Sequence, residues 1–101
     1  MEAIDRNLVA AYLLVKGTPG IAKSKLYFTE RGRKVVEWML QEGYIAQKGT
    51  GCYLTEHGEE IGALWAKVAE DARQDEDIEQ LIHSIEDRYN KRLALIKSKK
   101  E

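Results

Sequence analysis

The chain of 101 residues lacks several features that mark large classes of proteins. It has one cysteine, Cys52, which excludes an internal disulfide framework and a cysteine-based zinc site and favours a reducing compartment. Its single proline excludes collagen-like and linker-dominated chains. The longest apolar run, Leu8–Val15, falls far short of the ~20 residues that a membrane span needs, and the acidic start Met1–Asp5 lacks the basic flank of a secretory signal. We therefore expect a soluble, single-domain cytoplasmic protein.

Residues that carry catalysis or hold metals are also scarce. His57 and His83 lie far apart in the sequence, and neither has a partner at the helical spacing that a metal site requires. The glycine-containing segments 17–20 and 49–51 lack the spacing of a phosphate-binding loop. Cys52 is expected to be a small buried hydrophobic residue, with a redox sensor as the alternative. We therefore predict no enzymatic activity, no metal and no cofactor.

The charged residues, which make up 33% of the chain, are strongly segregated. Residues 16–48 hold seven bases and three acids, residues 56–87 hold eleven acids and two bases, and residues 88–101 hold six bases and one acid. The electric field that a ligand meets is local, so the net charge of −1 does not exclude a polyanionic partner for the two basic segments. The alternative interpretation is that these blocks are solvated helix faces.

Hydrophobic spacing and capping residues predict the first half of the fold. Ala3–Lys16 carries apolar residues at helical spacing, and residues 17–20 break this helix with a proline and two glycines. Ile21–Tyr27 fits two turns of helix. A further helix begins at Thr29, whose hydroxyl can cap it, and ends at Gly43, which suits a left-handed C-terminal cap.

Two strands and a long helical segment follow. Tyr44–Lys48 and Cys52–Leu54 are expected to be strands, and the glycine-containing turn between them makes a β-hairpin. Thr55 caps the next helix. Helical spacing continues to residue 98 through a polar patch at Gln74–Asp77, where either one helix passes or two helices meet. The chain is therefore predicted to be mostly α with a small β-hairpin (α+β).

Two segments resemble known proteins. Val35–Ile45 is similar to the end of the recognition helix of winged helix-turn-helix proteins, where an apolar–x–x–Gly–apolar–Ile pattern leads into the wing. Tyr53–Gly58 resembles the strand-to-helix junction that closes this wing. With its long C-terminal helix, the chain resembles MarR-type and PadR-type regulators and small archaeal winged-helix proteins that dimerise through an antiparallel coiled coil. The likeness implies a winged helix-turn-helix domain in residues 1–72 and a C-terminal dimerisation helix with a basic tail in residues 73–101.

Gly32 departs from this pattern, which places a larger apolar residue on the buried side of the recognition helix. A glycine inside a helix costs about 1 kcal/mol relative to alanine. Either another helix packs very close to Gly32, or the first turn of the recognition helix is ordered only by a ligand.

The resemblance implies that the chain binds duplex DNA. The major groove is about 12 Å wide and admits one helix, here residues 29–42, whose N-terminal residues reach the base edges. Arginine commonly reads guanine, the bases of the preceding short helix would lie against phosphates, and the wing at residues 44–54 would meet the flanking backbone or minor groove. The residues expected to contact DNA are Lys23, Ser24, Lys25, Thr29, Glu30, Arg31, Arg33, Lys34, Gln47, Lys48 and Thr50.

The C-terminal apolar stripe needs a surface to cover it, because a domain of about 65 residues is too small for an amphipathic extension of about 40 residues. A second copy is the simplest partner, since most soluble oligomers are two-fold homodimers. Antiparallel pairing would place the acidic start of this helix opposite its basic end. The residues expected at the dimer interface are Ile78, Leu81, Ile82, Ile85, Tyr89, Leu93 and Ile96. The alternative is that the helix folds back on its own domain.

We therefore predict a homodimeric, sequence-specific DNA-binding protein that acts as a transcriptional regulator. The alternative hypothesis is a winged helix that serves as a protein-interaction adaptor without binding DNA. Glu30, Glu37 and Glu42 on the expected recognition helix favour the adaptor, because carboxylates repel phosphates, and the acidic segment 56–87 would be its docking surface.

Overall fold

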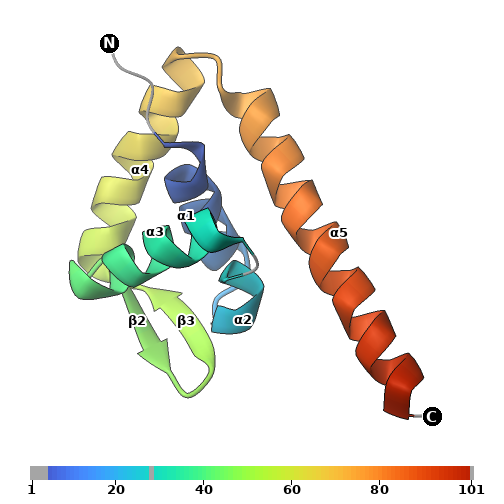
Figure 1. The fold of residues 1–101 in the computed structure, drawn as a ribbon. Helices are drawn as coiled ribbons and strands as arrows, with labels where there is room; N and C mark the ends of the chain where they lie inside the picture. Colours follow the sequence, from blue (N-terminus) through green and yellow to red (C-terminus); the bar gives the residue numbers. More distant parts are fainter. Residues whose placement is uncertain (1–4, 28, 101) are drawn as a thin grey trace.

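The computed structural model describes residues 5–27 and 29–100, which form a mostly helical fold with a small three-stranded antiparallel sheet (Figure 1). The elements follow one another as α1 (Arg6–Gly17), β1 (Ile21–Ala22), α2 (Lys23–Leu26), α3 (Glu30–Gln41), β2 (Ile45–Lys48), β3 (Gly51–Leu54), α4 (Glu56–Asp71) and α5 (Asp75–Lys100). The predicted combination of helices with a β-hairpin is confirmed.

The first helix, α1, lies at the centre of the core. Asp5 caps it, because its Oδ1 accepts a hydrogen bond of 2.9 Å from the backbone N–H of Asn7. Val9, Tyr12 and Val15 are almost fully buried, and α1 packs against α3, α4 and α5. The first residues of the predicted helix, 3 and 4, lie outside the described part of the chain.

The predicted helix at Ile21–Tyr27 is wrong in its first two residues. Ile21 and Ala22 form β1, which pairs antiparallel with Cys52 and Gly51 of β3, and α2 begins only at Lys23. The expected hairpin is thereby extended to a sheet with the order β1-β3-β2. A strand of two residues has no periodicity of its own, so its partner in β3 is what stabilises it.

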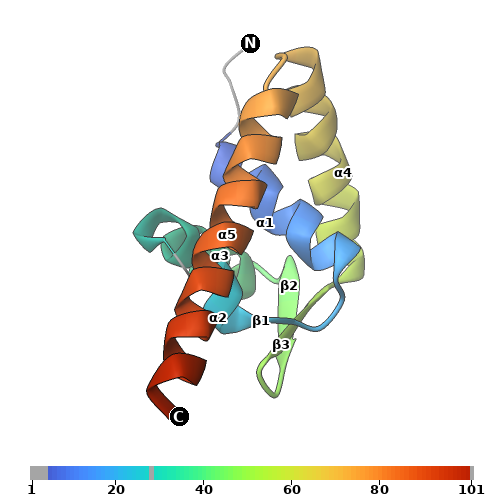
Figure 2. The same cartoon turned by 90° about the vertical axis from the view of Figure 1, so that its right-hand side faces the viewer.

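The hairpin formed by β2 and β3 projects from the helical body (Figures 1 and 2). Lys48 pairs with Gly51, which leaves Gly49 and Thr50 as a two-residue loop. Gly49 has a φ of 62°, a left-handed conformation that two-residue hairpin loops require and that glycine adopts without strain. The predicted hairpin is confirmed, with Gly51 in β3 rather than in the turn.

The starts of α3 and α4 use the same local structure. Thr29 Oγ1 accepts a hydrogen bond of 2.9 Å from the N–H of Gly32, and Thr55 Oγ1 accepts one of 3.0 Å from the N–H of Gly58. A Cβ at Gly32 would lie 2.8 Å from the backbone carbonyl oxygen of Leu26, at the end of α2. Of the two explanations for Gly32, close packing of a neighbouring helix is therefore the one that the structure shows.

The polar patch at Gln74–Asp77 separates two helices, which settles the alternative that the sequence leaves open. Arg73 has a φ of 57°, and the N–H of Gln74 donates to the carbonyl oxygen of Ala69 over 2.8 Å, a bond that ends α4 in a tight turn. The chain then reverses, and α5 runs back across α1 (Figures 1 and 2).

The first half of α5 packs against its own domain, so the predicted role of Ile78 and Ile85 in pairing with a second copy is wrong. Ile78 and Ile85 are only 2% and 6% exposed, in clusters with residues of α1, and Leu81 and Ile82 are partly buried beside them. The reversal after α4 brings this half of α5 over α1. The prediction compared only the lengths of the domain and of its extension, and these lengths do not indicate a reversal. Leu93 and Ile96 are exposed on the half of α5 that extends past the body.

Candidate nucleic-acid interface

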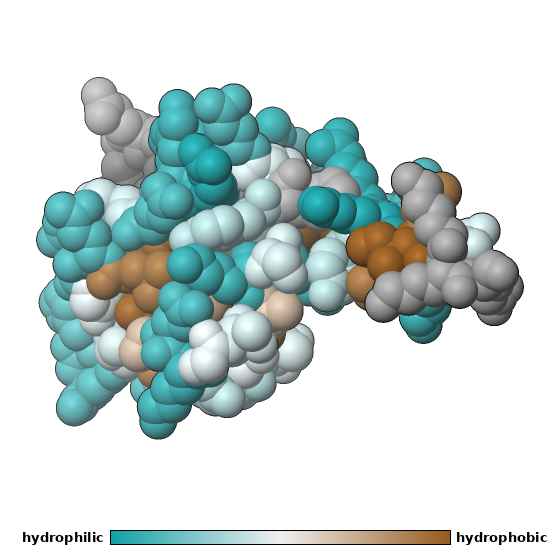
Figure 3. All heavy atoms as spheres, turned by 60° about the horizontal axis from the view of Figure 1, so that its bottom comes forward, coloured by the Kyte–Doolittle hydropathy of each residue, from teal (hydrophilic) through white to brown (hydrophobic). Residues whose placement is uncertain are grey.

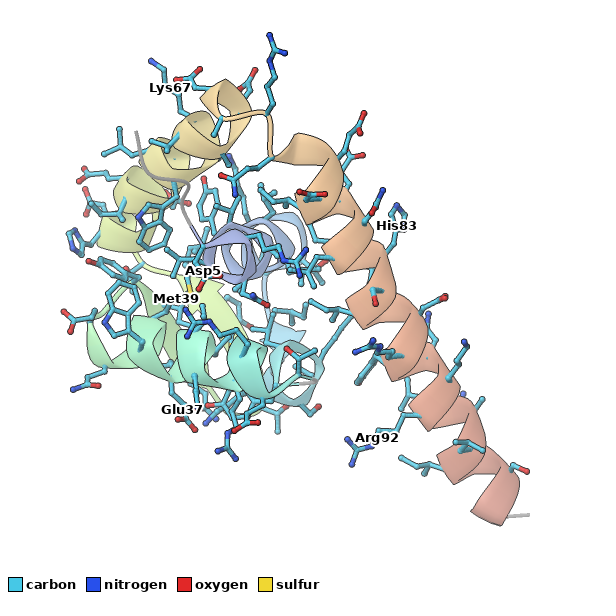
Figure 4. All side chains as sticks on the ribbon, turned by 45° about the horizontal axis from the view of Figure 1, so that its top comes forward. Asp5, Glu37, Met39, Lys67, His83 and Arg92 are labelled. Carbon is cyan, nitrogen blue, oxygen red and sulfur yellow. The ribbon has the colours of Figure 1, made fainter. Side chains whose placement is uncertain are left out.

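The outer face of α3 is the charged surface that the sequence predicts. Its inner face is made of buried Gly32, Val35, Val36 and Met39. The side chains of Arg31, Arg33 and Lys34 are 61%, 55% and 62% exposed, so all three cations are accessible to solvent. Figure 4 shows Glu37 on the side of α3 that is turned away from Met39 and the core.

Each of these three cations lies beside a carboxylate. Arg33 Nε is 3.9 Å from Glu37 Oε1, and Lys34 Nζ is 3.8 Å from Glu30 Oε1. Both are exposed pairs of residues four apart on one helix, which stabilise a helix by only about 0.2–0.5 kcal/mol. A phosphate group can therefore replace either carboxylate at little cost in stability.

The pair between Arg31 and Asp5 is different, because it joins two elements. Arg31 Nε donates to Asp5 Oδ2 over 2.9 Å, and its Nη2 also binds this oxygen. Burial raises the pKa of Asp5, but the hydrogen bonds from Arg31 and Asn7 outweigh that effect, so the pKa of this carboxyl lies below its usual value. Asp5 stays ionised at neutral pH and holds Arg31 against the start of α1. Asp5 is not among the site residues predicted from the sequence. Its place before a helix indicates a capping residue, but no residue near it in the sequence indicates that its partner is Arg31.

The residues of α2 that are expected to contact phosphates point in different directions. Lys23 Nζ lies 3.2 Å from Gln47 Oε1 in β2, which turns Lys23 toward the hairpin. Lys25 is turned toward α5 instead, where its Nζ is 3.8 Å from Glu86 Oε1 and 5.5 Å from the centre of the Tyr89 ring, and its side chain is largely covered. Lys23 and the exposed Ser24 therefore stay accessible, whereas Lys25 is engaged within the chain.

The tip of the hairpin presents the three remaining predicted residues. Gln47, Lys48 and Thr50 are exposed, and Gln47 Nε2 donates to the carbonyl oxygen of Gly49 over 2.9 Å. Lys48 Nζ lies 5.7 Å from the centre of the Tyr53 ring. Figure 3 views the side on which the hairpin and the end of α5 project, and hydrophilic side chains surround a smaller hydrophobic patch on the body.

Thr29 and Glu30 occupy the first turn of α3. The Thr29 hydroxyl oxygen is engaged in capping, and Glu30 is exposed and paired with Lys34. Negative charge in this turn interacts favourably with the helix dipole. These two residues therefore have clear local roles in starting α3.

An aromatic cluster that sequence analysis did not identify anchors the other end of α3. Trp38 lies 5.2 Å from Tyr44 and 6.2 Å from Trp65 between ring centres, and Tyr44 packs edge-on to Trp65. Tyr44 also stacks at 4.9 Å from the His57 ring. The cluster joins α3 to α4 and holds the angle between α3 and the hairpin. Trp38 is 42% exposed at its edge.

The described residues, 5–27 and 29–100, offer few groups that could bind a metal ion or act as a nucleophile. This part of the chain holds no group of three or more His, Cys, Asp or Glu side chains that could bind a metal ion. Cys52 is fully buried, and burial raises the pKa of its thiol, an effect that nearby Lys23 opposes. None of the described helices has the length and apolar character needed to cross a membrane.

Comparison of the chain with protein-family models, with curated proteins and with solved structures found no match.

Proposed function

We propose that this protein binds duplex DNA as a winged helix-turn-helix, with α3 in the major groove and the hairpin of β2 and β3 on the flanking backbone or minor groove. The observation that carries the proposal is the exposure of Arg31, Arg33 and Lys34 on the outer face of α3, beside a projecting hairpin. A single helix with cationic side chains near its N-terminal end matches the width and charge of the major groove.

The site residues take different roles in this proposal. Arg33 reads a base edge, because it lies one turn into α3 and its partner Glu37 is on the same exposed face. Lys23 and Lys48 contact phosphates on the side of the hairpin, which positions the protein without reading sequence. Within the described residues, neither lysine takes part in an ion pair. A sequence-specific contact of this kind suits a transcriptional regulator.

We also propose that two copies associate through the far half of α5. The surface that remains for this contact is formed by Tyr89, Leu93 and Ile96, which continue the stripe that is buried nearer the start of α5. This surface is flanked by bases, so added salt should strengthen the dimer by screening repulsion between like charges. Two copies would present two α3 helices to a two-fold symmetric DNA site.

Fluorescence anisotropy with labelled duplex DNA tests the proposal. We expect affinity to fall steeply with salt, because each phosphate that the protein neutralises releases counterions. Arg33→Ala should cost about 1–3 kcal/mol on a selected target duplex and relax sequence preference at one base pair. Lys67→Ala is the matched control, because Lys67 lies on α4, away from α3 (Figure 4).

Absence of binding to any duplex at low salt would rule out the proposal. Equal effects of Arg33→Ala and Lys67→Ala would show that α3 does not read the bases.

A protein-interaction adaptor is the second candidate function. It is favoured by Glu30, Glu37 and Glu42, which are exposed on or beside α3 and oppose phosphate binding. In this case the acidic outer surface of α4 would meet a basic partner. Glu37→Gln discriminates between the two functions: it should strengthen duplex binding if α3 enters the groove, whereas an adaptor should show no duplex binding with or without the substitution.

A further inference from the structure

We infer that α5 carries a second contact to the DNA backbone, formed by Arg88, Lys91 and Arg92 next to the cleft between α5 and the start of α3. This inference deepens the proposed function and depends on it, since it concerns the strand beside the groove that α3 occupies. The DNA-facing side of α5 adjoins the surface of Tyr89, Leu93 and Ile96 that is proposed for the contact between copies, and Arg92 lies at the border of the two.

The cleft brings three guanidinium groups together from three elements. It has a volume of about 400 Å³ and lies between the starts of α1 and α3 and the middle of α5. Arg6, Arg31 and Arg88 line it, with Thr29 at the start of α3, and Asp77 is the carboxylate on its wall. Arg31 is already paired with Asp5, so Arg6 and Arg88 exceed Asp77 by one positive charge in a concave site, where the low-dielectric walls focus the field.

Helical spacing extends this positive surface along α5. Arg88, Lys91 and Arg92 lie three and four residues apart, so they share one face of the helix. Arg88 lines the cleft together with Arg31, which shows that this face is turned toward the start of α3. Figure 4 shows Arg92 extending from α5 toward the side on which α2 and α3 lie.

The charge along this half of α5 is of one sign. From residue 88 to residue 98 the chain has four bases and no acid, and none of these bases takes part in an ion pair among the described residues. Like charges held together without counterions destabilise one another, so this surface favours an anion. Lys25 of α2 is already engaged with Glu86 and Tyr89, whereas Arg92 lines a hollow together with Ser24 of α2.

The length of the surface favours a DNA strand over a small anion. Arg88 and Arg92 are four residues apart, which corresponds to about 6 Å along the helix axis, and Lys91 lies between them on the same side of α5. Cations spread over this distance can contact more than one phosphate of a strand, whose charges are about 3.4 Å apart along the duplex axis. The end of α5 also projects on the same side of the molecule as the hairpin tip (Figures 1 and 2). A duplex on α3 would therefore have one strand against the hairpin and another against α5.

The salt dependence of duplex binding tests the inference. Full-length Arg88→Gln and Arg92→Gln variants are titrated with a 20-base-pair duplex by anisotropy between 0.05 and 0.3 M salt. Loss of one phosphate contact should lower the slope of log affinity against log salt by about 0.9, and affinity at 0.1 M salt by about eightfold. The loss should be the same for unrelated duplex sequences, since phosphates carry no sequence information.

Two control variants separate charge from structure. Arg88→Lys should restore most of the slope, because the charge is kept, whereas Lys67→Gln should leave the slope unchanged. Circular dichroism and thermal unfolding confirm that each variant is folded. A reduced affinity with an unchanged slope would overturn the inference, because the residue would then act on structure only.

The remaining outcomes are also distinguishable. If Arg33→Ala weakens binding but Arg88→Gln and Arg92→Gln do not, the contact through α5 is refuted and the proposed function stands. If the wild-type protein binds no duplex, both fail. Displacement of the duplex by millimolar inorganic phosphate through Arg88 alone would indicate a small-anion site and refute the strand contact.

Discussion

At the scale of single residues, nearby carboxylates offset the positive charge of the outer face of α3. Arg31, Arg33 and Lys34 are exposed, but each has an acidic neighbour within ion-pair distance. Two of these neighbours are on α3 itself, whereas Asp5 belongs to the segment before α1. Asp5 therefore both caps α1 and competes with any phosphate for Arg31.

Asp5→Asn should strengthen duplex binding. Asparagine caps a helix about as well as aspartate, so α1 should stay intact, while Arg31 loses its charged partner and becomes available to phosphates. We expect the salt slope to become steeper by up to about 0.9, measured by anisotropy. Glu70→Gln, at the exposed far end of α4, changes the net charge equally and serves as the control. Equal gains from both variants would mean that net charge alone matters.

At the scale of elements, the two threonine-capped helices depend on glycines that lie under backbone carbonyls. A Cβ at Gly58 would overlap the carbonyl group of Tyr44, the residue that precedes β2. The Thr55 hydroxyl also donates to the carbonyl oxygen of Gly43 over 2.6 Å. The start of α4 is thus packed against the end of α3, and this contact sets where the hairpin leaves the body.

Gly58→Ala should destabilise the protein, although alanine is the better helix former. Overpacking of this kind typically costs about 1–3 kcal/mol, measured as the free energy of unfolding in urea. Gly17→Ala is the matched control, because a Cβ there meets no atom within 4 Å, and it should stabilise the protein by about 0.4–1 kcal/mol. A neutral Gly58→Ala would show that the Tyr44 carbonyl moves freely.

At the scale of the whole molecule, α5 serves two purposes along its length. Its first half covers α1 and completes the core through Ile78 and Ile85. Its second half extends past the body and exposes Leu93 and Ile96, and Figure 3 shows a hydrophobic cluster at this projecting end. The part of α5 that completes the core is therefore separate from the part that we propose contacts a second copy.

Alanine substitutions in the two halves of α5 should affect different properties, namely stability in the first half and self-association in the second half. Ile78→Ala should lower the free energy of unfolding by about 2–5 kcal/mol, because it opens a cavity against α1. Ile96→Ala should change the unfolding of the single chain by less than about 0.5 kcal/mol. Light scattering should show weaker self-association for Ile96→Ala. Unchanged association would place the contact between copies elsewhere.

Helix starts, the hairpin and the periodic stripes are local properties of the chain, and the sequence predicts them well. Thr29 and Thr55 cap where expected, Gly49 closes the hairpin, and the inner face of α3 is the apolar one. The exposure of the α3 cations also follows from this alternation of faces. These features depend on residues within a few positions of one another, so periodicity and capping suffice to find them.

Contacts between distant segments depend on the folded arrangement. Ile21 pairs with Cys52, Asp5 binds Arg31, and Ile78 is buried against α1, all across long stretches of sequence. Each contact has a competing partner that is equally compatible with the local pattern, such as water for Arg31 or a second copy for Ile78. The direction in which the chain turns between α4 and α5, and the elements that pack around α1, determine which partner is bound. Both are set by tertiary packing rather than by local propensity.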